Sequence, residues 1–364
     1  MRDDQNNPED VLIKYLKLVA PGTLLYEGLE NVLRARTGGL IVVGDNEDVL
    51  ALVNGGFKID AEMHPAALYE LAKMDGAIVL SSDAKRILYA NAQLTPDPMI
   101  PSFETGTRHR TAERVAKETQ ALVISISQRR NVITMYYRNG KFVLRDVNVL
   151  LTKANQALST LEKYRSVFEQ ALVNLSALEF EDLVTLFDVA AVLQRGQMVA
   201  RIAKEIEKYI IQLGTEGRLV SMQLEELMGD IEDEGLLIVK DYCDLGVDEE
   251  AVNRAEEIWE DLIDWDSEEL LNLPSIARAL GHGGGTNVLE QSITPRGYRI
   301  LTKIPRLPMP VIENLVRAFG LLPSIMDASI EELDDVEGIG EVRAKAIKEG
   351  LRRLREQALL DRHL

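Results

Sequence analysis

The residues best suited to chemistry lie in the segment TGTRHR, at positions 105–110, where a proline-rich loop gives way to a helical pattern. Arg108 and Arg110 flank His109, and Thr107 stands just ahead of them. Arginine side chains and the free backbone N–H groups of a helix N-terminus both bind phosphate oxygens. The segment therefore indicates a phosphate-binding site, although the same residues would also suit an exposed helix face.

A second candidate group is DGA, at positions 75–77, directly before a predicted strand. Asp75 could hold a divalent ion, because Mg²⁺ in nucleotide chemistry is commonly bound by one or two carboxylates together with substrate phosphates. Gly76 has no side chain, so a base or ribose could lie against its backbone. An aspartate at this position is also a common turn residue, and the motif alone does not decide between the two readings.

Several other chemistries lack their motifs. The sequence has no GxxxxGK[ST] and no GxGxxG after its first strand, which argues against a P-loop NTPase and a dinucleotide-binding Rossmann domain. HExxH and GxSxG are also absent. The four histidines, at positions 64, 109, 282 and 363, do not have metal-ligand spacing. A single cysteine, Cys243, rules out a disulfide framework and a four-cysteine zinc site.

An α/β domain is predicted to position these groups, over residues 1–148. Helical patterns occupy 11–19, 23–36, 64–74 and 108–119, and short strands are predicted at 39–44, 49–56, 75–82, 86–94 and 121–127. Residues 132–147 read as a hairpin that turns at Asn139-Gly140. The alternation predicts an α/β fold, and the closing hairpin favours a mixed sheet. NGGFKID, at 54–60, supplies a glycine turn near the candidate site.

Residues 149–286 are predicted to form an all-α middle domain. Apolar stripes recur at helical spacing through most of this region, and GHGGGTNV at 281–288 then reads as a linker, with the role of Gly281–Gly285 left open. Between Glu225 and Glu269 there are 19 acidic residues against 2 basic ones, which accounts for nearly all of the net charge of −18. That block suits a solvated helix surface, or a surface that repels DNA. It does not exclude DNA binding elsewhere.

The tail, residues 287–364, contains the most specific motif. LDDVEGIGEVRAKAIKEGLRRL reads as a short helix, a Gly-Ile-Gly hairpin and a second helix, that is, a helix-hairpin-helix. Its glycines allow close approach to a DNA phosphate, which also meets the N-terminus of the second helix, so little sequence preference is expected. VIENLVRAFGLLPSIMDASIEEL, at 311–333, looks like the packing partner of a tandem pair, and its own hairpin, around Arg306 to Pro310, has prolines in place of the glycines. The residues predicted to bind DNA are Gly338, Ile339, Gly340, Arg343, Lys345 and Lys348.

The order of these parts resembles a known family. NGGFKID, DGA and TGTRHR resemble the marks of diadenylate cyclase domains, and the full chain resembles the DNA-integrity scanning diadenylate cyclases. These join a cyclase domain, a helical spine and a helix-hairpin-helix domain. The resemblance implies condensation of two ATP molecules into cyclic di-AMP with release of two pyrophosphates. It also implies Mg²⁺ or Mn²⁺, a homo-octamer with facing cyclase domains, and inhibition by branched DNA such as a Holliday junction.

Residue roles follow from the same resemblance. Asp75 would hold the metal and help to activate the 3′-hydroxyl, Leu94 would contact adenine through its backbone, and Ser127 and Arg130 are weaker candidates for the outgoing phosphates. The implied catalytic residues are Asp75, Arg108 and His109. The implied nucleotide-binding residues are Gly76, Ala77, Leu94, Thr107, Arg108, His109, Arg110, Thr111, Ser127 and Arg130.

Two other functions stay open from the residues alone: a scaffold that binds DNA and senses ATP without turnover, and a DNA-repair nuclease or ligase. Against the second, the motifs lack a dense carboxylate cluster and a ligase-type lysine. No window approaches the ~20 apolar residues of a membrane span, and the N-terminus lacks the basic start and apolar run of a signal peptide. A cytoplasmic protein with no membrane partner is therefore expected, and the family resemblance implies association with the nucleoid.

Overall fold

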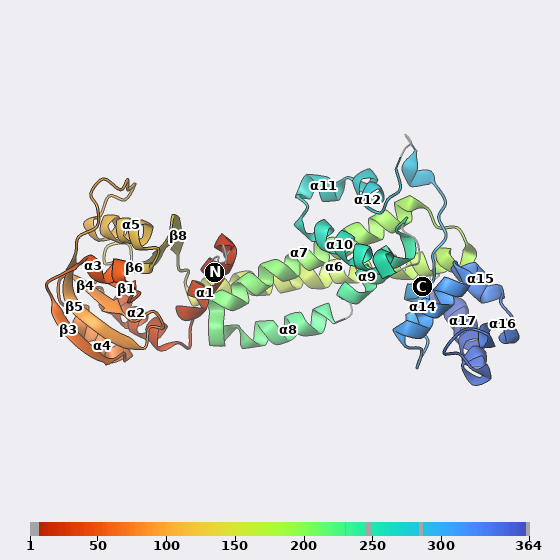
Figure 1. The fold of residues 1–364 in the computed structure, drawn as a ribbon, viewed down its shortest axis with the longest axis horizontal. Coiled ribbons are helices and arrows are strands. Elements are labelled where there is room, and N and C mark those ends of the chain that lie inside the picture. Colours follow the sequence, from red (N-terminus) through yellow and green to blue (C-terminus); the bar gives the residue numbers. More distant parts are fainter. Residues whose placement is uncertain (1–6, 230, 245–248, 284–286, 362–364) are drawn as a thin grey trace. The chain divides into compact units, whose positions relative to one another are not determined.

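The structure is a computed structural model that describes residues 7–229, 231–244, 249–283 and 287–361. The chain folds into two compact units (Figure 1). The first contains Met1–Asn155 with Glu207–Met222, and the second contains Gln156–Ile206 with Gln223–Leu364. Helices predicted for the middle domain are thus divided between the two units.

A mixed sheet organises the first unit. In the described residues its strands follow the order β2-β5-β4-β1-β6-β7-β8, and β3 also pairs with β5. The strands are β1 Gly39–Val43, β2 Val53–Asn54, β3 Phe57–Glu62, β4 Ala77–Leu80, β5 Arg86–Leu94, β6 Leu122–Ser127, β7 Val132–Tyr137 and β8 Gly140–Val143. β1 runs parallel to β4, while the other paired strands are antiparallel. The predicted mixed sheet is confirmed.

Helices cover both faces of this sheet, and each face has its own apolar core (Figure 1). The helices are α1 Pro8–Leu18, α2 Leu24–Ala35, α3 Glu47–Ala51, α4 Pro65–Leu71 and α5 Thr107–Thr119. One core joins α2 and α4 to residues such as Ile41, and the other joins α3 and α5 to residues such as Val42. Neighbours on a strand point to opposite faces, so β1 contributes to both cores, which explains its uninterrupted apolar sequence.

The strand predicted at 49–56 is wrong for most of its length. Residues 47–51 form the short helix α3, and only Val53 and Asn54 belong to a strand. The side-chain oxygen of Asn46 accepts the Val49 N–H at 3.0 Å and caps this helix. A run of apolar residues as short as VLALV fits a strand or a helix, and here the Asn46 cap favours the helix.

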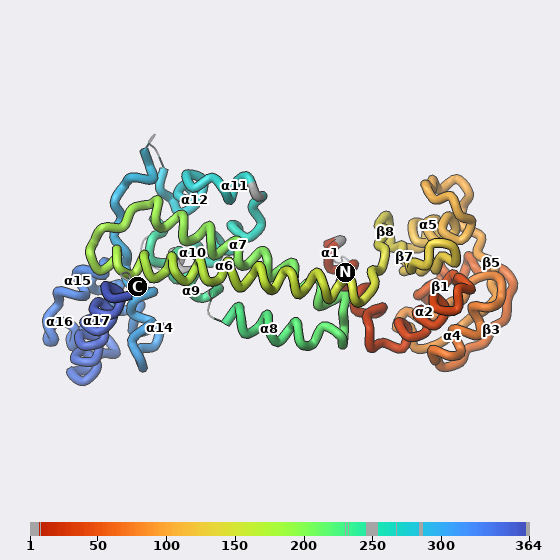
Figure 2. Tube along the Cα trace, turned by 180° about the vertical axis from the view of Figure 1, so that it is seen from behind, coloured from red at the N-terminus to blue at the C-terminus, as the bar shows by residue number. Residues whose placement is uncertain are grey.

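In its described residues the second unit is built of helices, as predicted for the middle and the tail, with one isolated bridge between Thr185 and Ser292 (Figure 2). Its longer helices include α6 Val147–Glu181 and α7 Leu186–Leu213, which also supply residues to the first unit, as does α8 Arg218–Met228. The others are α9 Ile231–Tyr242, α10 Glu249–Asp264, α11 Ser267–Leu271, α12 Leu273–Ala279, α13 Tyr298–Thr302, α14 Met309–Phe319, α15 Leu322–Asp327, α16 Ile330–Asp334 and α17 Glu341–Asp361. Short 3₁₀ turns lie at Gly214–Gly217 and Val288–Glu290.

Two helix-hairpin-helix pairs end the chain: α13 with α14, and α16 with α17. Gly338 takes φ +84° in the second hairpin, and Arg306 takes φ +65° at the matching place in the first. A Cβ on Gly338 would lie 3.3 Å from Val311 of α14, so the two pairs pack closely. The tandem arrangement is confirmed. Of the predicted linker, Gly284–Thr286 lie outside the described residues.

Candidate functional site

A cavity of about 620 Å³ in the first unit collects most of the predicted nucleotide-binding residues. It lies beside β4, β5 and the N-terminus of α5, and its volume is in the usual range for a small-molecule site. The predicted residues that line it are Gly76, Ala77, Leu94, Thr107, Arg108 and Thr111. Segments predicted from separate motifs, DGA and TGTRHR, therefore meet at one site.

Tight backbone contacts shape the floor of this cavity. Gly76 takes φ +89°, and a Cβ there would lie 2.8 Å from the carbonyl carbon of Asn91 and 2.9 Å from the Ala92 oxygen. Asn91 itself has φ +51°, where the pairing of β4 with β5 shifts register. A bulge of this kind turns backbone groups away from the regular ladder. Only glycine fits at position 76 without moving the neighbouring strand.

Arg108 is placed by a glycine that the sequence motifs did not point to. Its Nη1 lies 2.5 Å from the position that a Cβ would take on Gly38, which has φ +73°. Gly38 directly precedes β1. The missing side chain leaves room for the guanidinium at the cavity wall. The sequence signal was the pair Gly38-Gly39 ahead of a buried strand.

His109 faces away from the cavity lining and into a hydrogen-bonded chain. Its Nδ1 lies 3.0 Å from the Tyr136 hydroxyl, which donates to Glu104 Oε1 at 2.9 Å, and Lys141 Nζ lies 2.5 Å from the same oxygen. Since the hydroxyl proton goes to Glu104, Nδ1–H is the donor to Tyr136. Burial lowers the pKa of His109, and the positive charges of Lys141, Arg130 and Arg108 lower it further, against the raising effect of Glu104.

The remaining predicted residues lie outside the cavity lining. Asp75 is exposed and directly precedes Gly76. The Nε of Arg110 donates to the Glu104 carbonyl at 3.3 Å. Ser127 ends β6, and its hydroxyl accepts the backbone N–H of the exposed Arg130 at 3.2 Å.

Four cavity residues were missed by motif reasoning: Leu40, Asn91, Ala92 and Gln93. Leu40 belongs to β1, and the other three belong to β5. Ala77 pairs with Ala92 in the register of β4 and β5. The predicted strands at 75–82 and 86–94 are adjacent in sequence, so the end of one could have been expected to lie opposite the start of the other. The sequence does not show which residues of the two strands lie opposite each other.

At the C-terminal hairpin, the predicted DNA-binding cations have protein partners. Arg343 Nη1 donates to the carbonyl of Gly338, and Lys345 Nζ pairs with Glu341 at 2.5 Å. Lys348 Nζ donates to the carbonyls of Met326 and Ala328 at 2.6 and 2.8 Å. Lys348 therefore ties α17 to the end of α15, whereas the Arg343 side chain stays at the exposed hairpin. A cavity of about 490 Å³ beside Arg343 is also lined by Arg306 of the first hairpin.

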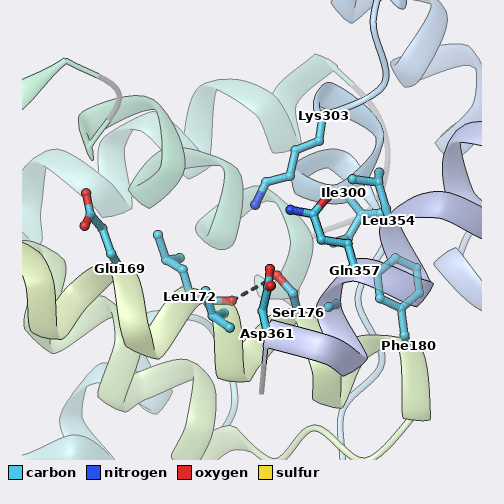
Figure 3. Close-up of a pocket in the computed structure, with 11 residues that line it drawn as sticks. Glu169, Leu172, Ser176, Phe180, Ile300, Lys303, Leu354, Gln357 and Asp361 are labelled. Atoms are coloured by element: carbon cyan, nitrogen blue, oxygen red, sulfur yellow. Dashed lines mark hydrogen bonds between the residues drawn. The ribbon is translucent and has the colours of Figure 1, made fainter. Parts of the chain in front are cut away.

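A buried ionic cluster fixes the first hairpin pair within the second unit. Arg299 of α13 is fully buried and pairs with Glu179 of α6, which also accepts the Tyr242 hydroxyl at 2.7 Å. The Asp241 carboxylate accepts three backbone N–H groups at the start of α13, at 2.6–3.0 Å. Beside it lies a cavity of about 290 Å³ between α6, α13 and α17, where Lys303 reaches toward Gln357 (Figure 3).

Three family models match the chain. The nucleotide-binding region of the DisA bacterial checkpoint controller matches residues 26–141, its linker region matches 144–289, and a helix-hairpin-helix motif matches 322–350. With the fold and the cavity, these matches define a nucleotide cyclase joined to a helix-hairpin-helix module.

Curated relatives resemble the chain over nearly its full length. A DNA integrity scanning protein DisA from Carboxydothermus hydrogenoformans is 62% identical over 96% of this chain and 98% of its own, and one from Clostridium botulinum is 57% identical over the same shares. A crystal structure of DacA from Staphylococcus aureus, 19% identical, covers 38% of this chain and 89% of its own, with a TM-score of 0.29. The chain belongs to the DNA integrity scanning protein DisA family.

It is accordingly a diadenylate cyclase with a DNA-binding helix-hairpin-helix module. Its substrate is ATP, and its reaction uses a divalent metal ion. Among the described residues, no helix has the length and apolar character needed to span a membrane.

Proposed function

We propose that the cavity beside β4, β5 and α5 holds one ATP per chain. The observation that carries this proposal is the meeting of Gly76 with Thr107 and Arg108 in one cavity of suitable volume. The nucleoside would lie against Gly76 and Ala77, whose surroundings are backbone and small side chains, with Leu94 beside the adenine. The phosphates would extend toward Thr107, Arg108 and Thr111 at the N-terminus of α5, where free N–H groups favour anions.

The outgoing pyrophosphate would leave toward positively charged side chains. Arg108 lines the cavity, and the positive charges of Arg108, Arg130 and Lys141 help to lower the pKa of the adjacent His109. We assign Ser127, Arg130 and Arg110 to this phosphate side. His109 contributes by position: its Nδ1 holds Tyr136 and Glu104 in place behind the start of α5.

Asp75 is the proposed metal-holding residue, for Mg²⁺ or Mn²⁺. No group of three or more metal-ligating side chains occurs in the part of the chain that the structure describes. A single carboxylate beside the cavity fits an ion whose other ligands are water and the phosphates of ATP. When bound, the ion supplies positive charge to the phosphate oxygens. Asp75 also helps to activate the 3′-hydroxyl.

Two chains must face each other for the reaction. Each 3′-hydroxyl oxygen attacks the α-phosphorus of the other ATP, forming two P–O bonds, breaking two bonds to pyrophosphate and releasing two hydroxyl protons. Positioning accounts for most of the catalysis in such phosphoryl transfers. A cavity in one chain holds one nucleotide, so the second is brought by another copy. We propose that the facing pairs assemble into a homo-octamer.

The helix-hairpin-helix module is proposed to bind branched DNA, such as a Holliday junction, and thereby to lower cyclase activity. Gly338, Ile339 and Gly340 form the turn that approaches a phosphate, and Arg343 and Lys345 add charge. Contacts to phosphates position a protein without reading sequence, which suits recognition of DNA shape. We place the protein in the cytoplasm, at the nucleoid.

The test is to incubate the purified protein with ATP and either metal, and to resolve products by chromatography and mass spectrometry. Asp75→Asn is expected to keep ATP binding and lose cyclic di-AMP, whereas Arg108→Ala weakens ATP binding as well. A Holliday junction added to the wild-type protein lowers the rate. Full activity of a folded Asp75→Asn protein would overturn the metal assignment.

A further inference from the structure

The loop at 95–106 presents large apolar side chains to solvent directly before the cavity-lining start of α5. Phe103 is 93% exposed and Met99 is 84% exposed. Aromatic and methionine side chains are enriched at protein–protein contacts. A phenylalanine that touches almost nothing within its own chain is therefore a candidate contact residue.

The loop is held in a defined conformation by α5. Each bond below joins a backbone group of the loop to a side chain of that helix. They are Asp97 N–H to Glu118 Oε2 at 2.9 Å, Arg114 Nε to the Ile100 carbonyl at 2.9 Å, Lys117 Nζ to the Pro101 carbonyl at 2.8 Å, and Phe103 N–H to Glu113 Oε2 at 3.2 Å. The backbone is thus tied down at four places.

A half-buried ion pair strengthens this attachment. Glu113 pairs with Lys117 at 2.7 Å, and its other oxygen also accepts the Ser102 hydroxyl at 2.5 Å. The hydrogen bonds from Lys117 and Ser102 keep the pKa of Glu113 low, although burial alone would raise it. The side chain therefore stays charged and holds the loop. Preorganising a surface in this way reduces the entropy that is lost on binding.

We propose that Phe103 and Met99 form a contact surface for the cyclase domain of a second copy of this chain. The inference deepens the proposed function, because it rests on two chains facing each other. The loop continues without interruption into Thr107 and Arg108, which line the cavity. The second ATP must come within bonding distance of the first, so the chain that carries it approaches the cavity whose lining begins where this loop joins α5.

The first experiment compares Phe103→Ser with Leu24→Ser in the full-length protein. Leu24 is a 52% exposed leucine at the start of α2, away from the loop in sequence, and serves as the matched control. Cyclic di-AMP formation per chain is measured over a dilution series, with sedimentation velocity at the same concentrations. Phe103→Ser is expected to need about tenfold or more protein for half-maximal activity, with unchanged ATP affinity, because central contact residues carry much of an interface's affinity.

The second experiment replaces the same positions by cysteine and follows alkylation by a thiol reagent. The native Cys243 is buried and gives a low background. In the assembled protein, Phe103→Cys is expected to react several-fold more slowly than Leu24→Cys, and dilution to single chains reverses that order. Equal or faster reaction at position 103 in the assembly, together with an unshifted dilution curve, overturns the loop contact. A wild-type protein that is fully active as a single chain overturns the facing arrangement instead.

Discussion

At the scale of single residues, the candidate site depends on two glycines, because a Cβ atom at either position would collide with its neighbours. Gly76 and Gly38 leave space for the Asn91 backbone and for the Arg108 guanidinium, respectively. Both also have positive φ angles, which L-residues with side chains adopt at a cost. The motif DGA could be found in the sequence, whereas the need for glycine at position 38 became visible only when Arg108 was placed beside it.

The first prediction separates two effects of replacing a glycine at the cavity floor: the collision of a new Cβ with its neighbours, and the cost of a positive φ angle. Gly76→Ala is expected to abolish measurable ATP binding and to destabilise the first unit by clearly more than Gly55→Ala does. Gly55 has φ +66° and, among the described residues, nothing within 4 Å of a new Cβ, so its replacement costs the fold only the left-handed conformation, about 1–2 kcal/mol. Gly55 also lines the cavity, so the two substitutions are compared by their effect on stability. Calorimetric ATP titration and urea unfolding would check this. Equal effects of the two substitutions on the free energy of unfolding would contradict the steric explanation.

A second prediction concerns the protonation of His109. Burial lowers its pKa, so the folded protein favours the neutral ring. As the pH falls below about 6.5, the ordinary value, the unfolded chain takes up a proton first and the free energy of unfolding of the first unit decreases. His109→Asn keeps an N–H for Tyr136 and should remove this part of the pH dependence. Hydrogen exchange of β6 and β7 amides, corrected for intrinsic rates, would measure it; an unaltered pH slope would count against the assignment.

At the scale of elements, local pattern predicted most of the first unit. β1, β4, β5, β6 and the closing hairpin followed from apolar runs between turn residues, and α5 from its periodicity. The helix α3 was missed because its apolar run is too short to show a period. The bulge that sets the register of β4 against β5 depends on how the two strands pair. The sequence of either strand alone does not determine that pairing.

The third prediction distinguishes two cations on α17. Arg343→Ala is expected to weaken DNA binding and to reduce the slope of log affinity against log salt by about 1, as for one lost phosphate contact. Lys348→Met should lower the stability of the second unit, because two carbonyls lose their donor, and leave the salt slope unchanged. Fluorescence anisotropy with a labelled junction at several salt concentrations tests both. A fall in slope for Lys348→Met would return that residue to the DNA interface.

At the scale of the whole molecule, the buried ionic cluster joins parts that lie far apart in the chain. Arg299 comes 120 residues after Glu179, and no local pattern predicts that they meet. Among the described residues, Arg299 Nε and Nη1 have no hydrogen-bond acceptor, and Nη1 lies 3.7 Å from Glu234. The cluster therefore fixes α13 against α6 and α9 more by mutual charge than by complete hydrogen bonding, and removing one partner leaves a buried charge unpaired.

The fourth prediction concerns the loss of one partner from this buried ionic cluster. Arg299→Met should destabilise the second unit by about 3–5 kcal/mol, because Glu179 would be left buried without its cationic partner. The two tryptophans, Trp259 and Trp265, both belong to this unit, so their fluorescence in urea reports its unfolding selectively. A matched exposed substitution, Arg317→Met, is expected to shift the midpoint little. Similar midpoints for both variants would show that the cluster contributes no stability.

The same separation has a consequence during synthesis. At about 5–20 residues per second, a ribosome needs roughly 6–24 s to make the 120 residues between Glu179 and Arg299. Throughout that interval Glu179 lacks its cationic partner, and α6 cannot bury this carboxylate without cost. The second unit can therefore complete its packing only late in translation, after its acidic helices have already emerged.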